Sequence, residues 1–283
     1  MRLVENYGVR GNCVLVYEMH DETSHIVDTM KEKKVNGLVL SPLITDLSFL
    51  DEIHFINEIY VTGNKIKDIS QLYSLRKIQV IHLLNDDKMR LDLSCFPFLK
   101  EAVLIGRNGV DNLFNHRSLE KITLIDFKEK KEHVVGRSFL QSLEIKNSNI
   151  QAIPNLSSIK TLRSIKLSGL SKASDTAFLD GLKSIEEVSL SLCKKMAMSI
   201  IEDVSKLPSI RKISFSKMGD IPSVTKISNL VKLERLFLTE NTKITDGKIR
   251  FLLDMKALSY LVIQGFNHYD VNVWDLMNLI KNK

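Results

Sequence analysis

The chain has 283 residues, of which 44% are hydrophobic and 26% are charged. This composition excludes a disordered chain, and no apolar run approaches the roughly 18 residues that a membrane span needs. The net charge is +6, which favours acidic or nucleic-acid partners, but lysine and arginine are interleaved with aspartate and glutamate as on an ordinary solvated surface.

The three cysteines indicate a reducing compartment. Cys13, Cys95 and Cys193 are far apart and odd in number, which is typical of free thiols and disfavours a disulfide framework or a structural zinc site. The first residues also lack the apolar core of a secretory signal. We therefore expect a soluble, cytoplasmic protein.

Residues 1–34 are predicted to form an N-terminal cap. The segment Val14–Tyr17 is typical of a strand, and a helix is expected from about Glu22 to Lys33, with Ile26, Val27 and Met30 on its apolar face. The Cys13 thiol would then be buried and inert, because it lies within the cap strand.

A repeated apolar triplet begins after the cap. Its clearest copy is Ile56, Ile59 and Val61, followed by Asn64 and Ile66, with the spacing L-x-x-L-x-L-x-x-N-x-L. Eleven copies follow one another at intervals of 19 to 25 residues, which indicates a repeat fold. Their middle residues are Leu38, Ile59, Ile78, Ala102, Ile122, Leu143, Ile165, Val188, Ile213, Leu236 and Leu261.

These copies resemble the leucine-rich repeat family over about residues 35–266. The segment from Asn64 to Leu72 is similar to the bacterial, internalin-like subtype. The resemblance implies an α/β solenoid, or horseshoe, with about eleven short parallel strands on the concave face and 3-10 or α elements on the convex face. The family shares a scaffold and no common chemistry, so the resemblance implies an architecture without an activity.

The connections between the strands are predicted to change along the chain. The asparagine place is polar at Asn64 and Asn241 but apolar at Phe127 and Met218, which predicts a turn ladder sealed by apolar packing. The later, longer units leave room for outer helices. Three such helices are expected, around Phe178–Leu182, Ile200–Leu207 and Ile249–Met255.

Residues 268–283 are predicted to close the stack as a C-terminal capping helix. Val273, Trp274, Met277 and Ile280 form its expected apolar face, so Trp274 is assigned to the core. With repeats over 35–267, the whole chain is expected to be one continuous domain.

The sequence shows no catalytic, metal-binding or cofactor-binding constellation. The seven histidines form neither a His-Glu-x-x-His pair nor a cluster with cysteines, and there is no phosphate-binding glycine loop or nucleophile elbow. We therefore expect no enzymatic activity, no metal and no cofactor.

The concave face, which is the sheet face opposite the core, is the predicted binding surface. Period-two alternation places an apolar cluster there, next to a strip of serines from Ser164 to Ser216. The predicted partner-binding residues are Tyr60, Ile81, Val103, Ile105, Ile125, Phe237 and Tyr260. This assignment depends on the strand register, because a slip of one residue exchanges the buried and exposed sets.

The leading hypothesis is a non-catalytic scaffold that binds a partner protein through its concave sheet, with a bacterial immunity protein that neutralises a toxin as one form of it. One alternative is a secreted bacterial effector that binds a host protein. Another is a nucleic-acid-associated factor, suggested by the charge of +6, although its groove would need charges of one sign. The sequence predicts neither the partner's identity nor the oligomeric state.

Overall fold

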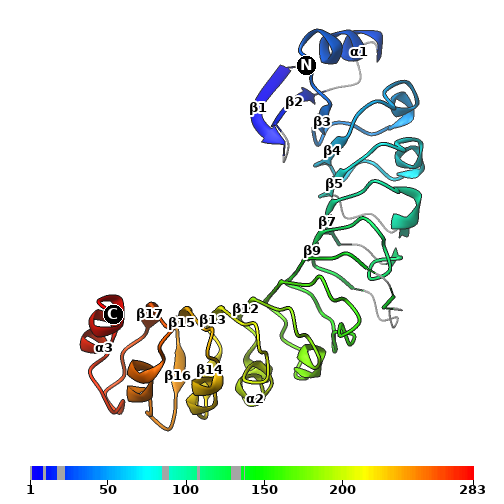
Figure 1. Ribbon diagram of the computed structural model, residues 1–283. Coiled ribbons are helices and arrows are strands. Elements are labelled where there is room, and N and C mark those ends of the chain that lie inside the picture. Colours follow the sequence, from blue (N-terminus) through cyan, green and yellow to red (C-terminus); the bar gives the residue numbers. More distant parts are fainter. Residues whose placement is uncertain are drawn as a thin grey trace. The chain divides into compact units, whose positions relative to one another are not determined.

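The computed structural model describes residues 2–8, 11–17, 23–84, 89–106, 109–128, 135–136 and 138–283. Contacts divide the chain into two compact units, Met1–Leu140 and Gln141–Lys283. In each unit the strands lie side by side along one face of the coils, and the helical connections lie on the other side (Figure 1). The two units are described separately.

Unit 1 contains a sheet of seven strands in the order β1-β2-β3-β4-β5-β7-β9. Strand β1 pairs with β2 in an antiparallel hairpin, and the other neighbours are parallel. The strands are β1 Arg2–Gly8, β2 Gly11–Val16, β3 Gly37–Leu40, β4 Glu58–Val61, β5 Val80–Leu83, β7 Glu101–Ile105 and β9 Lys121–Ile125. The connections contain helix α1 Thr23–Glu32, the 3-10 turns η1 Ser48–Glu52, η2 Ser70–Ser74 and η3 Leu93–Cys95, and the short strands β6 Leu91–Asp92 and β8 Val110–Asp111.

Unit 2 contains six parallel strands in the order β10-β11-β12-β13-β15-β17. They are β10 Ser142–Lys146, β11 Ser164–Ser168, β12 Glu187–Ser191, β13 Lys212–Ser216, β15 Arg235–Thr239 and β17 Tyr260–Ile263. The outer connections are mostly single turns. They comprise η4 Ala177–Leu179, η5 Lys194–Met196, α2 Ile200–Val204, β14 Gly219–Ile221, η6 Thr225–Asn229, β16 Thr242–Ile244 and η7 Arg250–Asp254.

The pairing register confirms the repeat frame and the leucine-rich-repeat solenoid fold. The middle residues of successive triplets pair directly, as in Leu143 with Ile165 and Ile213 with Leu236. They face the core: Ile59, Ile122 and Leu236 are 0%, 2% and 1% exposed. Five repeat strands in unit 1 and six in unit 2 make the eleven that the spacing predicts within the described residues. Alternation therefore places one side chain in two on the concave face.

One strand departs from the predicted frame. Ile81 pairs with Ile59 on one side and Ala102 on the other, so Ile81, and not Ile78, is the middle residue of its triplet. Ile81 is 0% exposed, and its prediction as a partner-binding residue on the concave face is wrong. The error arose because Leu75, Ile78 and Val80 mimic the triplet three residues early. With Ile81 in place, all ten spacings lie between 20 and 25 residues.

A left-handed turn ends most of the strands. The φ angle is positive four residues after the middle residue at Gly106, Asp126, Asn147, Gly169, Leu192, Lys217 and Glu240. The next residue then points inward, and it is buried at Phe127, Ser148, Leu170, Cys193 and Met218. This confirms the apolar turn ladder. Asn64 and Asn241, the two clearest asparagines, are instead exposed, and Thr242 fills the buried place beside Met218, whose backbone N–H donates to its hydroxyl.

The predicted outer helices are mostly shorter than expected. Phe178 and Leu179 are buried from the three-residue turn η4, and the segment beginning at Ile249 forms the 3-10 turn η7. Only the segment around Ile200 forms an α-helix, the five-residue α2. Helical spacing of apolar residues predicted which side chains are buried, because a single 3-10 turn satisfies the same spacing over so few residues.

The C-terminal cap is helix α3 Val273–Lys281, whose first turn is capped by the Asn272 side chain. Val273, Leu276 and Ile280 are buried, whereas Trp274 is 74% exposed, so its assignment to the core is wrong. Trp274 follows Val273 by one residue, about 100° around the helix, which turns its ring away from the face that packs against β17.

The N-terminal cap contains the predicted strand and helix. Strand β2 ends at Val16, and α1 is described from Thr23, while Glu22 lies outside the described residues. The hairpin partner β1 was not predicted.

Candidate interaction surface

The N-terminal part of the concave face in unit 1 is covered. Tyr60 is only 3% exposed, because the Tyr7 ring from β1 packs edge-on against it with centroids 5.3 Å apart. Cys13, Val39, Val80 and Leu15 pack around Tyr60 as a small core on this face. Tyr60 is therefore not an exposed partner-binding residue as predicted. The hairpin that covers it is the element that sequence reasoning missed.

Polar side chains border this covered core. The Tyr60 hydroxyl donates to Glu58 Oε2 at 2.6 Å, and Glu58 is 2% exposed. The His82 ring contacts the Tyr60 ring with centroids 4.6 Å apart, and its Nε2 lies 3.4 Å from Glu101 Oε1. Glu101 in turn lies 3.9 Å from Lys121 Nζ. These contacts hold the concave side chains of β4 to β9 in place where the covered core ends.

Beyond these groups, unit 1 has a partly exposed apolar patch. Val103, Ile105 and Ile125 are partly exposed on β7 and β9, where Ile105 pairs directly with Ile125. Leu84 follows Leu83 at the end of β5, in the place that Ile105 holds on β7, and it is also partly exposed. We call Leu84, Val103, Ile105 and Ile125 the apolar patch. Leu84 was missed because its strand was read three residues early.

Unit 2 has the predicted serine strip on its concave face. Ser189 pairs with Ser214, and Ser191 pairs with Ser168 and Ser216. All five side chains are partly exposed. Small hydroxyl side chains leave the strand backbone close to solvent, so a partner chain can approach this part of the sheet closely.

A charged network lies beside the serine strip. Glu187 Oε1 lies 2.8 Å from Lys212 Nζ, Glu187 Oε2 lies 3.5 Å from Lys166 Nζ, and the Ser164 hydroxyl donates to Glu187 Oε2 at 3.2 Å. Burial opposes ionisation of Glu187, but Lys212, Lys166 and Ser164 outweigh it and lower the pKa of the carboxyl group below its usual value. Glu187 is therefore ionised at neutral pH, and one carboxylate serves two lysines.

Aromatic and basic side chains meet at the C-terminal end of this face. The Phe237 and Tyr260 rings are in contact with centroids 5.5 Å apart, and Lys212 Nζ lies 5.7 Å from the centroid of Phe237. Arg235 lies between Lys212 and Tyr260 in the same row of the sheet and is exposed. We call Lys212, Arg235, Phe237 and Tyr260 the aromatic–basic cluster. It contains Phe237 and Tyr260, two of the residues that the sequence analysis predicts to bind a partner.

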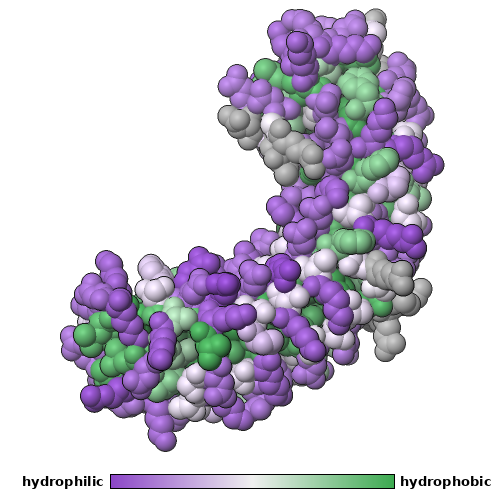
Figure 2. Space-filling model, in the orientation of Figure 1, coloured by the Kyte–Doolittle hydropathy of each residue, from purple (hydrophilic) through white to green (hydrophobic). Residues whose placement is uncertain are grey.

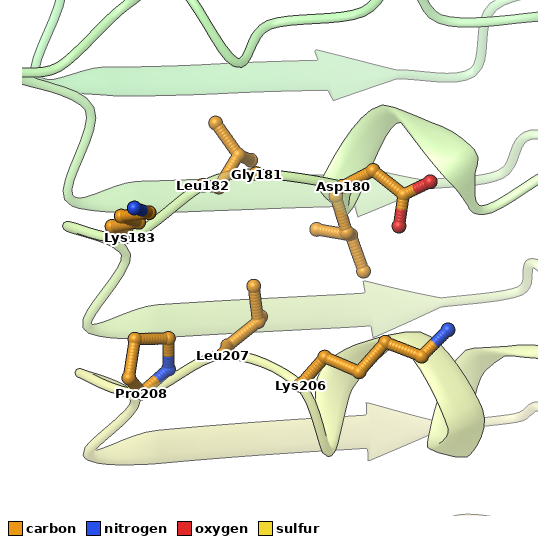
Figure 3. Close-up of a pocket in the computed structure, with 8 residues that line it drawn as sticks. Asp180, Gly181, Leu182, Lys183, Lys206, Leu207 and Pro208 are labelled. Carbon is orange, nitrogen blue, oxygen red and sulfur yellow. The ribbon is translucent and has the colours of Figure 1, made fainter.

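The convex side of unit 2 has a shallow hollow of about 210 Å³. It lies between the connections that follow η4 and α2, and Leu182, Leu207 and Pro208 contribute to its apolar lining (Figure 3). Sites for small molecules are usually larger, at about 300–1,000 Å³, and have converging polar groups. The hollow therefore has the size of a packing defect between two coils.

The part of the chain that the structure describes has no group of three or more histidine, cysteine or acidic side chains placed to hold a metal ion. None of its helices combines the length and the apolar character needed to cross a bilayer. The visible surface is mostly hydrophilic, with small apolar groups between (Figure 2).

Comparison with known proteins supports the fold alone. No protein-family model and no curated protein matches the chain, but 66 chains of solved structures do. The functional domain of InlJ from Listeria monocytogenes matches with a TM-score of 0.51 and 16% identity, over 85% of this chain and 56% of that one. The TLR13–ssRNA13 complex matches with a TM-score of 0.54 and 14% identity, over 87% and 45%.

An internalin, InlF, also from Listeria monocytogenes, covers 87% of this chain and 78% of its own at 18% identity, with a TM-score of 0.47. The InlJ domain is described as including a cysteine ladder. In the present chain Cys193 is buried at the turn after β12, in the place that Leu170 and Met218 hold after the neighbouring strands. The likeness to the InlJ domain and to the TLR13 complex agrees with the leucine-rich-repeat fold predicted from the sequence.

Proposed function

We propose that this protein is a non-catalytic scaffold that binds a partner protein through the concave face of its sheet. The observation that carries the proposal is the apolar patch of unit 1. Four partly exposed aliphatic side chains lie together on neighbouring strands of the sheet, where water would otherwise contact them. Contiguous apolar surface of this kind marks interaction sites more often than chance placement does.

The charges around the patch support a protein as the partner. Glu101 and Lys121 lie side by side on neighbouring strands of unit 1. In unit 2, described by itself, the concave strands also carry both signs, as in Glu144 and Lys146. An apolar centre with a rim of mixed charge is the usual composition of a protein–protein interface. A nucleic-acid groove needs a run of positive charge, and such a run does not occur on the described concave strands.

Capture of the partner from the cell of origin tests the proposal. Ile105→Asp should lower the yield of the captured partner at least tenfold, because it places a charge in the centre of the patch, while the thermal unfolding of the protein changes little. The yield is measured by affinity purification and quantitative mass spectrometry.

Phe98→Asp is the matched control. Phe98 is 58% exposed in the connection before β7, outside the concave face, so the same chemical change is made on another surface of unit 1. Equal capture by wild-type protein and the Ile105→Asp variant would contradict the proposal, as would an equal loss with Phe98→Asp.

The captured partner also decides the biological role. We propose a cytoplasmic bacterial immunity protein. The three free thiols, of which Cys13 and Cys193 are buried, support the cytoplasmic location. A toxin whose activity is blocked by the purified chain would support this role. A host-cell protein would make the chain a secreted effector instead.

A further inference from the structure

The cations of the aromatic–basic cluster are in excess over nearby carboxylates. Strands β13, β15 and β17 place Lys212 and Arg235 on the concave face and no acidic residue among their outward positions. Glu187 is shared between Lys212 and Lys166. No carboxylate among the described residues pairs with Arg235. The cluster therefore carries positive charge that the described residues do not neutralise.

The neighbouring carboxylates are already engaged elsewhere. Glu234 pairs with Arg211 at the edge of the sheet, and Glu240 accepts a hydrogen bond from Ser216 and lies 3.6 Å from Lys217 Nζ. Neither is available to Arg235 without breaking these contacts. An acidic group from outside the chain is the complementary partner for this guanidinium.

The aromatic rings give the cluster an apolar half. Tyr260 is 50% exposed and Phe237 partly exposed, and their contact forms one apolar surface directly beside Arg235. The Lys212 ammonium near the Phe237 ring restrains that side chain from the other side. Tyrosine, phenylalanine and arginine are enriched in interface centres because they combine large contact area with directional polar groups.

A short segment of polypeptide suits this surface better than a nucleic acid. Lys212 already pairs with Glu187, so Arg235 is the cation of the cluster that has no carboxylate partner among the described residues. One such cation is too few to follow the phosphate backbone of a nucleic acid. The serines of β12 and β13 beside the cluster give a low floor along which an extended chain can lie.

We propose that the aromatic–basic cluster binds an acidic segment of a partner protein. A carboxylate of the segment meets Arg235, and an adjacent aromatic or aliphatic side chain packs against Phe237 and Tyr260. This inference rests on the proposed function, since it names the chemistry of one part of the partner. It concerns unit 2 and does not involve the apolar patch.

A random twelve-residue peptide library displayed on phage tests the inference with the full-length protein. Wild-type protein should enrich peptides in which aspartate or glutamate neighbours an aromatic or aliphatic residue. The most frequent peptide is then synthesised with a fluorescent label and titrated by anisotropy. Arg235→Glu should weaken its binding at least tenfold, and Phe237→Ser should also weaken it.

Arg250→Glu is the control, because it makes the same charge change at an exposed position of unit 2, on η7. It should alter binding less than twofold. Circular dichroism establishes that each variant is folded. A neutral or basic consensus, no enrichment, or equal losses in Arg235→Glu and Arg250→Glu would overturn the inference.

A labelled twelve-nucleotide oligouridine is titrated in parallel. Binding that depends on Arg235 and is tighter than that of the peptide would make the surface a nucleic-acid site and overturn the inference. The outcome is independent of the capture experiment, because no cellular partner is used. If no Arg235-dependent acidic peptide is found but capture of the cellular partner still depends on Ile105, only this inference is contradicted.

Discussion

Ile81 and Leu84 are three residues apart, but only Ile81 faces the core. Ile81 is fully buried between Ile59 and Ala102, whereas Leu84 is partly exposed and belongs to the apolar patch. Both side chains are aliphatic, so residue type alone does not tell which of the two is buried. The pairing partners do, because each parallel neighbour fixes which side of the sheet a residue faces. Single-sequence spacing could place ten of the eleven middle residues and failed at the one where a second apolar triplet precedes the true one.

Two aspartate substitutions, at the buried Ile81 and at the partly exposed Ile105, test the register. Ile81→Asp should lower the free energy of unfolding by more than about 3 kcal/mol, because it buries a carboxylate without a partner. Ile105→Asp, on the concave face of β7, should lower it by less than about 1 kcal/mol. Urea unfolding followed by circular dichroism measures both. Similar losses at the two sites would mean that the register is wrong.

Side chains in the connections between strands hold successive coils together through hydrogen bonds to backbone groups. His116 illustrates this in unit 1, where it is buried and its Nδ1 accepts the backbone N–H of Leu119 at 3.0 Å. Its Nε2 lies 3.1 Å from the Phe96 carbonyl of the preceding coil. The sequence showed seven histidines without a pattern, and nothing in their spacing distinguished this structural one. The β1 hairpin escaped prediction for a similar reason, since its packing on Tyr60 is a contact distant in sequence.

The buried state of His116 predicts a pH dependence. Burial lowers the pKa of the imidazole below its usual 6.5, although the Phe96 and Leu93 carbonyls partly oppose the shift. The unfolded chain then binds the proton more readily, so the free energy of unfolding should fall as the pH drops through 6.5 and below.

His116→Phe should remove the contribution of this site to the pH dependence and cost about 1–3 kcal/mol at pH 7, because the Leu119 N–H loses its acceptor. Urea unfolding at several pH values measures both effects. The exposed His54→Asn variant should change the free energy of unfolding at pH 7 by less than about 0.5 kcal/mol. A wild-type profile in His116→Phe would show that this imidazole is not held neutral by burial.

At the scale of the whole molecule, the repeat determines the scaffold and leaves the residues of the concave face free to vary. Each coil buries the same triplet against its neighbours, so the period could be found in the sequence. The concave residues are not constrained by the core, and their identities follow no period. Phe237, Tyr260, Val103, Ile105 and Ile125 could be placed on this face from alternation alone. Tyr60 could not be recognised as covered, nor Trp274 as exposed, because both depend on how the caps pack.

The most direct test of binding through the concave sheet is site-specific photo-crosslinking in the cell of origin. Benzoylphenylalanine is introduced at Val103 or Phe237 on the concave face, and at Val231 or Met198, which are 78% and 74% exposed in the outer connections. We predict that the concave positions crosslink to a partner protein and the outer positions do not. Crosslinks from Val231 or Met198 alone would contradict the account.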